Sequence, residues 1–137
     1  MQGISHITFI VKDLEKAKFF FETIFDAKEI YDSGRQMFSL SQEKFFLIGE
    51  LWIAIMEGDA VLERTYNHIA FKISEEEFDL YEKRIKVAGV EYLQPRLRVA
   101  GEGQSLYFYD FDNHLFELHT GTLVERLVRY QEKQDVG

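Results

Sequence analysis

Two histidines open near-copies of one short pattern, His-Ile-x-Phe, at residues 6–9 and 68–71. His6 and His68 lie 62 residues apart, and each copy leads into a segment with helical spacing. In a later strand-like segment Glu117 alternates with apolar neighbours; if those pack under the helices, Glu117 faces the same cavity as the histidines. Two imidazoles and one carboxylate suit a divalent transition-metal ion and leave positions open for water or substrate.

The residues alone also allow plainer interpretations. A lone strand histidine is more often hydrogen-bonded in a structural role than bound to a metal. His119 shares the expected face of Glu117 and could be taken for a ligand, whereas His114 falls in a turn where a structural role is expected. Glu43 lies in the polar segment 41–44, where it is either a solvated loop charge or a positioned general base.

The elements that must position these residues follow the same order in both halves. The first half predicts a strand, a helix capped by Asp13, and three further strands, over residues 4–11, 14–25, 28–32, 37–40 and 45–56. The second half predicts a strand at 68–73, a helix from the Ser74–Glu77 capping box to Gly89, and strands at 91–93, 105–110 and 115–119. Thr122 and Glu125 form another capping box, so residues 123–131 should be a terminal helix.

A single βαβββ unit has an open sheet face that must be covered. We therefore predict an α+β fold in which two βαβββ modules supply about eight strands, as a curled mixed sheet around one shared metal site. The chain is predicted to be one domain, 1–137, with module 1 at about 1–60, module 2 at about 61–121 and the terminal helix at about 122–132.

Composition narrows the function classes. The net charge of −8, from 24 acidic and 16 basic residues, argues against nucleic acid or an anionic membrane as the main partner. The absence of cysteine excludes a thiol nucleophile and a zinc-thiolate site, and it agrees with a reducing compartment. No apolar run approaches the roughly 20 residues that span a bilayer, so we expect a soluble, cytoplasmic protein.

A set of longer motifs, in order along nearly the whole chain, resembles a known family. They read His-Ile-Thr at 6–8, Phe-Phe-Leu-Ile at 45–48, Leu-Trp-Ile at 51–53, Glu-Arg-Thr-Tyr-Asn-His at 63–68, Gly-Glu-Gly at 101–103, Tyr-Phe-Tyr-Asp-Phe-Asp-Asn-His-Leu-Phe-Glu at 107–117 and Gly-Thr-Leu at 121–123. The chain thereby resembles the vicinal oxygen chelate (glyoxalase and bleomycin resistance) superfamily. Within it, the chain is similar to fosfomycin-resistance proteins, above all the fosfomycin epoxide hydrolases.

The resemblance implies a metal centre and a reaction. His6, His68 and Glu117 would hold Mn²⁺ or another divalent ion in a strand-exchanged homodimer, in which His6 comes from one subunit and the other two ligands from its partner. The ion would act as a Lewis acid on the epoxide oxygen of fosfomycin. Glu43 matches the general base that activates water, and the product would be a vicinal diol.

The resemblance also implies a substrate pocket. Arg126 matches the arginine that pairs with the phosphonate, for which a planar guanidinium is well suited. The other positions that match substrate contacts are Thr8, Trp52, Tyr66, Ser105 and Tyr107. Arg96 and Arg98 are further candidates, with a solvated basic loop as the alternative, because their segment departs in length from the potassium-binding loop of the thiol-transferring relatives.

Two other functions fit the same scaffold. A fosfomycin thiol transferase would share the metal and phosphonate sites, so Glu43 is the main residue that favours hydration over thiol transfer. A non-catalytic, ligand-sequestering protein would need neither three metal ligands nor a base. Hydration of another small epoxide or phosphonate also stays open.

Overall fold

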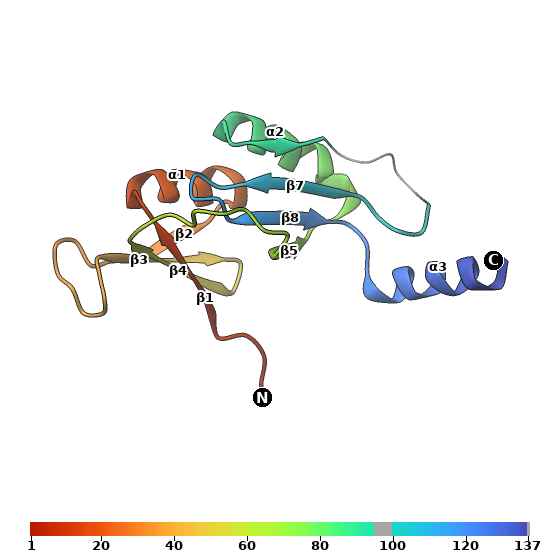
Figure 1. Cartoon of the computed structure of the whole chain (residues 1–137), viewed down its shortest axis with the longest axis horizontal. Coiled ribbons are helices and arrows are strands. Elements are labelled where there is room, and N and C mark those ends of the chain that lie inside the picture. The colour runs from red at the N-terminus through yellow and green to blue at the C-terminus, as the bar shows by residue number, and fades with distance from the viewer. Residues whose placement is uncertain (95–99, 137) are drawn as a thin grey trace.

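The same order of elements occurs in both halves of the chain in the computed structural model, which describes residues 1–94 and 100–136 (Figure 1). The first half contains β1 (His6–Val11), α1 (Leu14–Phe25), β2 (Lys28–Asp32), β3 (Glu43–Ile48) and β4 (Leu51–Glu57). The second half contains β5 (His68–Lys72), the 3₁₀ turn η1 (Glu75–Glu77), α2 (Phe78–Ala88), β6 (Tyr92–Leu93), β7 (Ser105–Tyr109) and β8 (Leu115–His119). The helix α3 (Leu123–Val136) follows.

The strands form two sheets with matching topology. The N-terminal sheet has the order β1-β4-β3-β2 and the C-terminal sheet the order β5-β8-β7-β6. The strand β1 runs parallel to its neighbour β4, and β5 runs parallel to its neighbour β8. His6 pairs with Trp52 in the first sheet as His68 pairs with Leu115 in the second. This arrangement confirms the predicted α+β class with mixed sheets, and the strands form two four-stranded sheets with no closed barrel among the described residues.

The core joins both sheets to the helices. Alternation along β1 buries Phe9 and Val11 and leaves His6, Thr8 and Ile10 on the opposite, exposed face, as the sequence predicted. The largest fully buried side chains come from α1, from the N-terminal sheet and from the C-terminal sheet, and include Phe20, Phe21, Phe46, Phe108 and Phe116. Burial of each such side chain contributes about 1.5–3 kcal/mol, so one aromatic core stabilises both modules together.

The predicted caps at the starts of the helices are confirmed, and so is the predicted end of α2 at Gly89. The Asp13 carboxylate accepts hydrogen bonds from the backbone of Glu15 and Lys16 at the start of α1. Ser74 and Glu77 form the capping box before α2, and Gly89 ends that helix with a φ of 72°. The Thr122 hydroxyl accepts from the backbone N–H of Glu125 at 3.1 Å, as a capping box requires.

Two strand predictions in the first module are wrong. Residues 37–40 are irregular, and Met37, Phe38 and Leu40 are exposed. The run 45–56 is not one strand but two, because Gly49 turns the chain with a φ of 58° between β3 and β4. The second strand of this hairpin pairs with β1, so residues 37–40 have no place in the sheet and form part of a loop instead.

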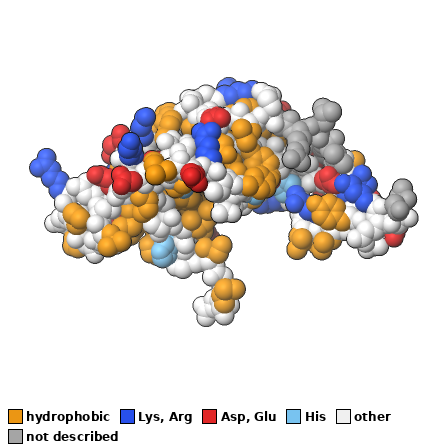
Figure 2. All heavy atoms as spheres, in the orientation of Figure 1, with side chains coloured by type: hydrophobic (Ala, Val, Ile, Leu, Met, Phe, Trp, Pro, Cys, Tyr) orange, Lys and Arg blue, Asp and Glu red, His pale blue; other side chains and the backbone are white. Residues whose placement is uncertain are grey.

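The helix α3 extends away from the rest of the chain (Figure 1) and runs beyond the predicted end at residue 131. Its apolar side chains Leu123, Val124, Leu127, Val128 and Tyr130 are all more than 45% exposed, and apolar atoms gather on this part of the surface (Figure 2). An apolar stripe of this kind is typical of a surface that another chain covers. Within residues 1–94 and 100–136, no helix is long and apolar enough to cross a membrane.

Candidate metal and substrate site

His68 and Glu117 face each other across neighbouring parallel strands of the C-terminal sheet. Nε2 of His68 lies 3.0 Å from Oε1 of Glu117. Glu117 is 6% exposed, and His68 is partly buried at the first position of β5. The register pairs Ala70 with Glu117, so the small alanine side chain leaves the carboxylate room to reach the imidazole.

The hydrogen-bond pattern of His68 and Glu117 favours the binding of a cation between them. Nδ1 of His68 lies 2.7 Å from the backbone oxygen of Tyr66, which can only accept, so Nδ1 carries the proton. Nε2 of the neutral ring then presents a lone pair to Glu117, whose carboxylate is also an acceptor. Two acceptors at this distance need a shared proton or a cation between them, and a histidine oriented through its other nitrogen is the usual arrangement at a metal.

A chain of hydrogen bonds with a defined direction continues from Glu117. Arg126 Nη2 lies 3.3 Å from Nε2 of His119, and because arginine only donates, that nitrogen accepts. The His119 proton therefore lies on Nδ1, 2.7 Å from Oγ of Ser105, and Ser105 donates its own proton to Oε2 of Glu117 at 2.5 Å. Burial lowers the pKa of His119, in agreement with this neutral ring.

His68, Glu117, His119 and Arg126 line a cavity of about 330 Å³ at the base of α3. The residues that line it are His68, Ala70, Glu117, His119, Gly121, Thr122, Leu123 and Arg126. A carboxylate, imidazoles and a guanidinium thus surround one volume, which suits a small anionic ligand next to a metal ion.

Two tyrosines lie beside His68. The Tyr66 and Tyr107 hydroxyls are 3.1 Å apart, and both rings contact the His68 ring. Burial, the Tyr66 hydroxyl and the nearby charge of Glu117 raise the pKa of Tyr107 well above its ordinary value. Tyr107 therefore stays protonated and can donate a hydrogen bond.

His6 lies in the N-terminal sheet, away from this cluster. Its ring stacks on Trp52 with centroids 4.0 Å apart, and Nδ1 is 3.0 Å from Oγ of Ser5. Trp52 Nε1 is buried and has no hydrogen-bond partner among the residues the structure describes. The strand register puts Thr8 and Glu43 on the same sheet face as His6.

One chain does not gather the whole predicted ligand set. Within residues 1–94 and 100–136, no three His, Asp or Glu side chains lie close enough together to hold a metal ion. His68 and Glu117 meet, together with Ser105 and Arg126, but His6 and Glu43 belong to the other sheet. Arg96 and Arg98, which the sequence also suggested, lie outside the described residues.

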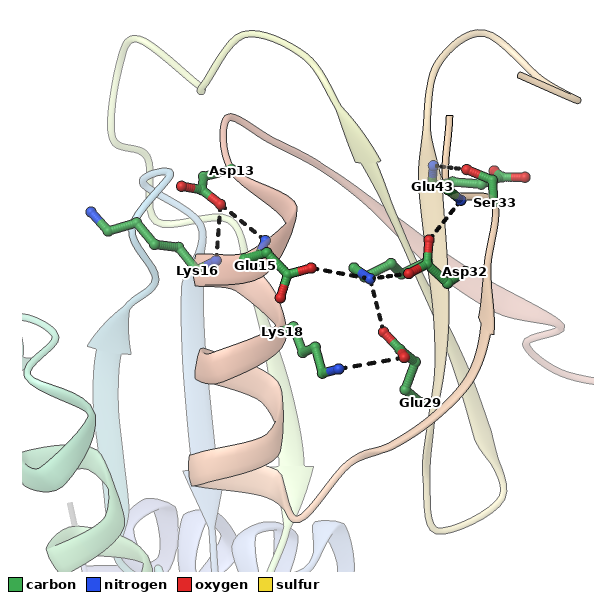
Figure 3. A network of polar contacts seen from close by, with 10 residues as sticks. Asp13, Glu15, Lys16, Lys18, Glu29, Asp32, Ser33 and Glu43 are labelled. Carbon is green, nitrogen blue, oxygen red and sulfur yellow. Dashed lines mark hydrogen bonds and ion pairs between the residues drawn. The ribbon is translucent and has the colours of Figure 1, made fainter. Parts of the chain in front are cut away.

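Sequence reasoning missed a buried cation next to Glu43. Lys44 is 3% exposed, and its ammonium group contacts Glu15, Glu29 and Asp32 (Figure 3). Burial opposes the charge of Lys44, but its contacts with these carboxylates outweigh that effect and raise the pKa of Lys44. The hydrogen bond that Lys44 donates to Asp32 in turn lowers the pKa of Asp32. The acidic residues are scattered along the sequence, so only the pairing of β2 with β3 could reveal the cluster.

The two sheets of matching topology, each with its first strand parallel to its fourth, define the class of protein. Residues 4–122 match the family described as glyoxalase-like domain, and the chain belongs to this family. Its close relatives within the family are fosfomycin resistance proteins. FosX of Listeria monocytogenes is 66% identical over 132 residues, which cover 96% of this chain and 99% of that protein. The resemblance predicted from the motifs is thereby confirmed.

Solved structures of FosX proteins support the same family assignment. A crystal structure of a glutamate-to-glutamine variant of Listeria monocytogenes FosX, complexed with Mn(II) and 1S,2S-dihydroxypropylphosphonic acid, has a TM-score of 0.84 and 62% identity. That comparison covers 95% of this chain and 98% of the other. The thiol-transferring relatives are more distant: metallothiol transferase FosB of Bacillus licheniformis is 35% identical over 136 residues, covering 96% of this chain and 84% of that protein.

Proposed function

We propose that this protein is a Mn²⁺-dependent epoxide hydrolase that hydrates fosfomycin to a vicinal diol and so confers resistance to the antibiotic. The main support is the FosX structure that holds Mn(II) and a dihydroxypropylphosphonic acid at 62% identity to this chain. That ligand carries hydroxyls on adjacent carbons, which is what addition of water to the epoxide of fosfomycin yields. The His68–Glu117 pair, which needs a cation or a proton between its two acceptors, supports a metal at the equivalent place here.

The complete metal site is proposed to form between two copies of the chain. His68 and Glu117 of one copy would be joined by His6 of the other, because His6 lies on an exposed sheet face that a second copy can reach. The exposed apolar stripe of α3 supports an interface between copies. Three protein ligands leave coordination positions open, as a metal that also binds substrate requires.

The chemistry divides between the metal and the side chains. Bound Mn²⁺ would supply Lewis acidity toward the oxygen that becomes an alkoxide when the ring opens. Glu43 takes a proton from water as the water oxygen bonds to the phosphonate-bearing carbon and the carbon–oxygen bond of the ring breaks. The alkoxide oxygen then gains a proton, which completes the diol.

The remaining residues bind and orient the phosphonate. Arg126 donates from its guanidinium to the phosphonate oxygens, in the cavity that it already lines. Ser105 and Tyr107 offer hydroxyl groups from β7, and Tyr66 offers one from the segment just before β5. Thr8 and Trp52, from the sheet face of His6, would complete the pocket in the two-copy arrangement, with Trp52 against the substrate methyl group.

A phosphorus NMR experiment tests the function directly. Purified protein is incubated with Mn²⁺ and fosfomycin, with and without glutathione, and His68→Ala serves as the metal-binding control. Formation of the diol without thiol supports the hydrolase. An adduct formed only with thiol would assign the protein to the thiol transferases, to which FosB belongs, and bound but unchanged drug would assign it to the ligand-sequestering proteins.

A cytoplasmic location is the remaining part of the proposal. A chain without cysteine is typical of a protein that neither needs nor risks disulfides, as in a reducing compartment. Cell fractionation followed by immunoblotting checks this location, and recovery of the protein in the periplasmic or medium fraction would contradict it.

A further inference from the structure

Lys44 directly follows the proposed base, and no step of the proposed reaction uses it. Its ammonium nitrogen lies 2.7 Å from Oδ2 of Asp32, 3.1 Å from Oε1 of Glu29 and 3.3 Å from Oε1 of Glu15 (Figure 3). The Asp32 contact is a hydrogen bond, whereas the Glu29 oxygen is an ion-pair partner without hydrogen-bond geometry. A lysine buried to this degree needs such partners, because an unpaired buried charge is strongly unfavourable.

A β-bulge in β2 creates this cluster. Tyr31 pairs with Phe45 but Glu29 pairs with Phe46, so Ile30 is an extra residue opposite β3. In a regular strand Glu29 and Asp32 would point to opposite faces, because they are three residues apart. The bulge turns both carboxylates to the face of Lys44, and bulges commonly re-aim side chains next to active sites.

A second set of hydrogen bonds holds the backbone of Glu43, the neighbour of Lys44. The backbone N–H of Glu43 donates to Oγ of Ser33 at 2.9 Å, and the backbone N–H of Ser33 donates to the backbone oxygen of Glu43 at 3.0 Å. Glu43 and Lys44 are consecutive in β3, so their side chains point to opposite faces. Lys44 points toward α1 and β2, and Glu43 points to the sheet face that carries His6.

Glu43 lies at the start of a strand, where its position depends on contacts that hold the strand end in place. It is the first residue of β3 and follows an irregular segment in which Met37, Phe38 and Leu40 are exposed. Strand ends that follow exposed loops fray unless they are tied down. A general base must keep its oxygen within hydrogen-bond reach of the water it activates, so a fraying strand end would reduce the rate.

We propose that Lys44 is a positioning residue of the reaction: its contacts with Asp32, Glu29 and Glu15 fix the start of β3 and thereby aim the Glu43 carboxylate. The inference rests on the proposed function, in which Glu43 is the base. It assigns the bulge at Ile30 a role as well, since the bulge supplies two of the three carboxylates.

The test compares Lys44→Met with the matched control Lys18→Met. Lys18 contacts the other oxygen of Glu29 at 3.4 Å but lies on α1, so its loss removes a cation from the same cluster without releasing β3. Turnover of fosfomycin with Mn²⁺ is followed by phosphorus NMR, and Mn²⁺ affinity by electron paramagnetic resonance. Lys44→Met is expected to lower kcat about tenfold or more with KM and Mn²⁺ affinity nearly unchanged, whereas Lys18→Met keeps wild-type kcat.

A double variant separates positioning from a general structural effect. If Lys44 acts through Glu43, adding Lys44→Met to Glu43→Gln lowers the residual rate no further. An equal loss with and without Glu43, a parallel loss of Mn²⁺ affinity, or wild-type kcat in Lys44→Met would each overturn the inference. Full turnover by Glu43→Gln would overturn the proposed base instead, so the two failures are distinguishable.

Asp32→Asn keeps the test decisive should Lys44→Met fail to fold. It removes the charge of the nearest partner of Lys44 while leaving an oxygen for the Gly34 backbone N–H, which donates to Asp32 at 2.7 Å. A smaller fall in kcat with unchanged KM is expected. Unchanged kcat in a variant shown to have lost the Lys44 contact would count against the positioning role.

Discussion

Nε2 of His68 lies 3.0 Å from Oε1 of Glu117, and the other nitrogen of the same ring is fixed by the backbone oxygen of Tyr66. The pair is therefore oriented as half of the proposed metal site would be. His6, which holds the equivalent strand position in the N-terminal sheet, stacks on Trp52 instead. The proposed site is complete only when a second copy of the chain supplies this third ligand.

Mixing two inactive variants tests the shared site. His6→Ala and His68→Ala are each expected to lose Mn²⁺ binding and turnover. In a mixed dimer one site carries both substitutions and the other carries neither, so random exchange should restore about one quarter of wild-type activity. Co-expression with two affinity tags isolates the mixed dimers. No recovery in verified mixed dimers would place all three ligands within one chain.

Removal of the proposed base should separate binding from chemistry. Glu43→Gln is expected to retain Mn²⁺ and fosfomycin binding while kcat falls about 10²- to 10⁴-fold, the usual contribution of a general base. Phosphorus NMR measures turnover and calorimetry measures binding. Glu50→Gln, in the exposed turn between β3 and β4, is the matched control and should keep wild-type rates.

Arg126 should act mainly on phosphonate binding. Arg126→Met is expected to raise KM for fosfomycin about tenfold or more, because a hydrogen bond between charged groups contributes about 1.5–3 kcal/mol. Mn²⁺ affinity should change little. Arg129→Met is the control, since Arg129 lies one turn further along α3 and pairs with Glu132 at 3.8 Å. Equal KM values in the two variants would remove Arg126 from the pocket.

Close backbone packing at Gly103 should make it sensitive to substitution. A Cβ there would lie 2.6 Å from the backbone nitrogen of Gly121, and its φ is +78°. Gly103→Ala is expected to lower the free energy of unfolding by about 2–5 kcal/mol, from backbone strain and overpacking together. Gly34→Ala, with a φ of +60° and open space around it, carries the strain alone. Urea denaturation compares the two, and equal midpoints would contradict the packing argument.

The sequence by itself determined the elements and the faces of the strands. Alternation along β1 predicted that His6 and Thr8 oppose Phe9 and Val11, and the capping residues predicted where the helices begin. The repeat predicted that His6 and His68 hold equivalent positions. These features depend on residues close together in the chain, so a local pattern is sufficient to find them.

Only the tertiary structure decided which strands pair and which side chains meet. The division of residues 45–56 into a hairpin and the exposure of residues 37–40 follow from the competition for sheet positions, which no local pattern records. The bulge at Ile30 gathers carboxylates around Lys44, and strand register brings Glu117 to His68. Register joins distant segments, and a shift of one residue would turn each of these side chains to the other face.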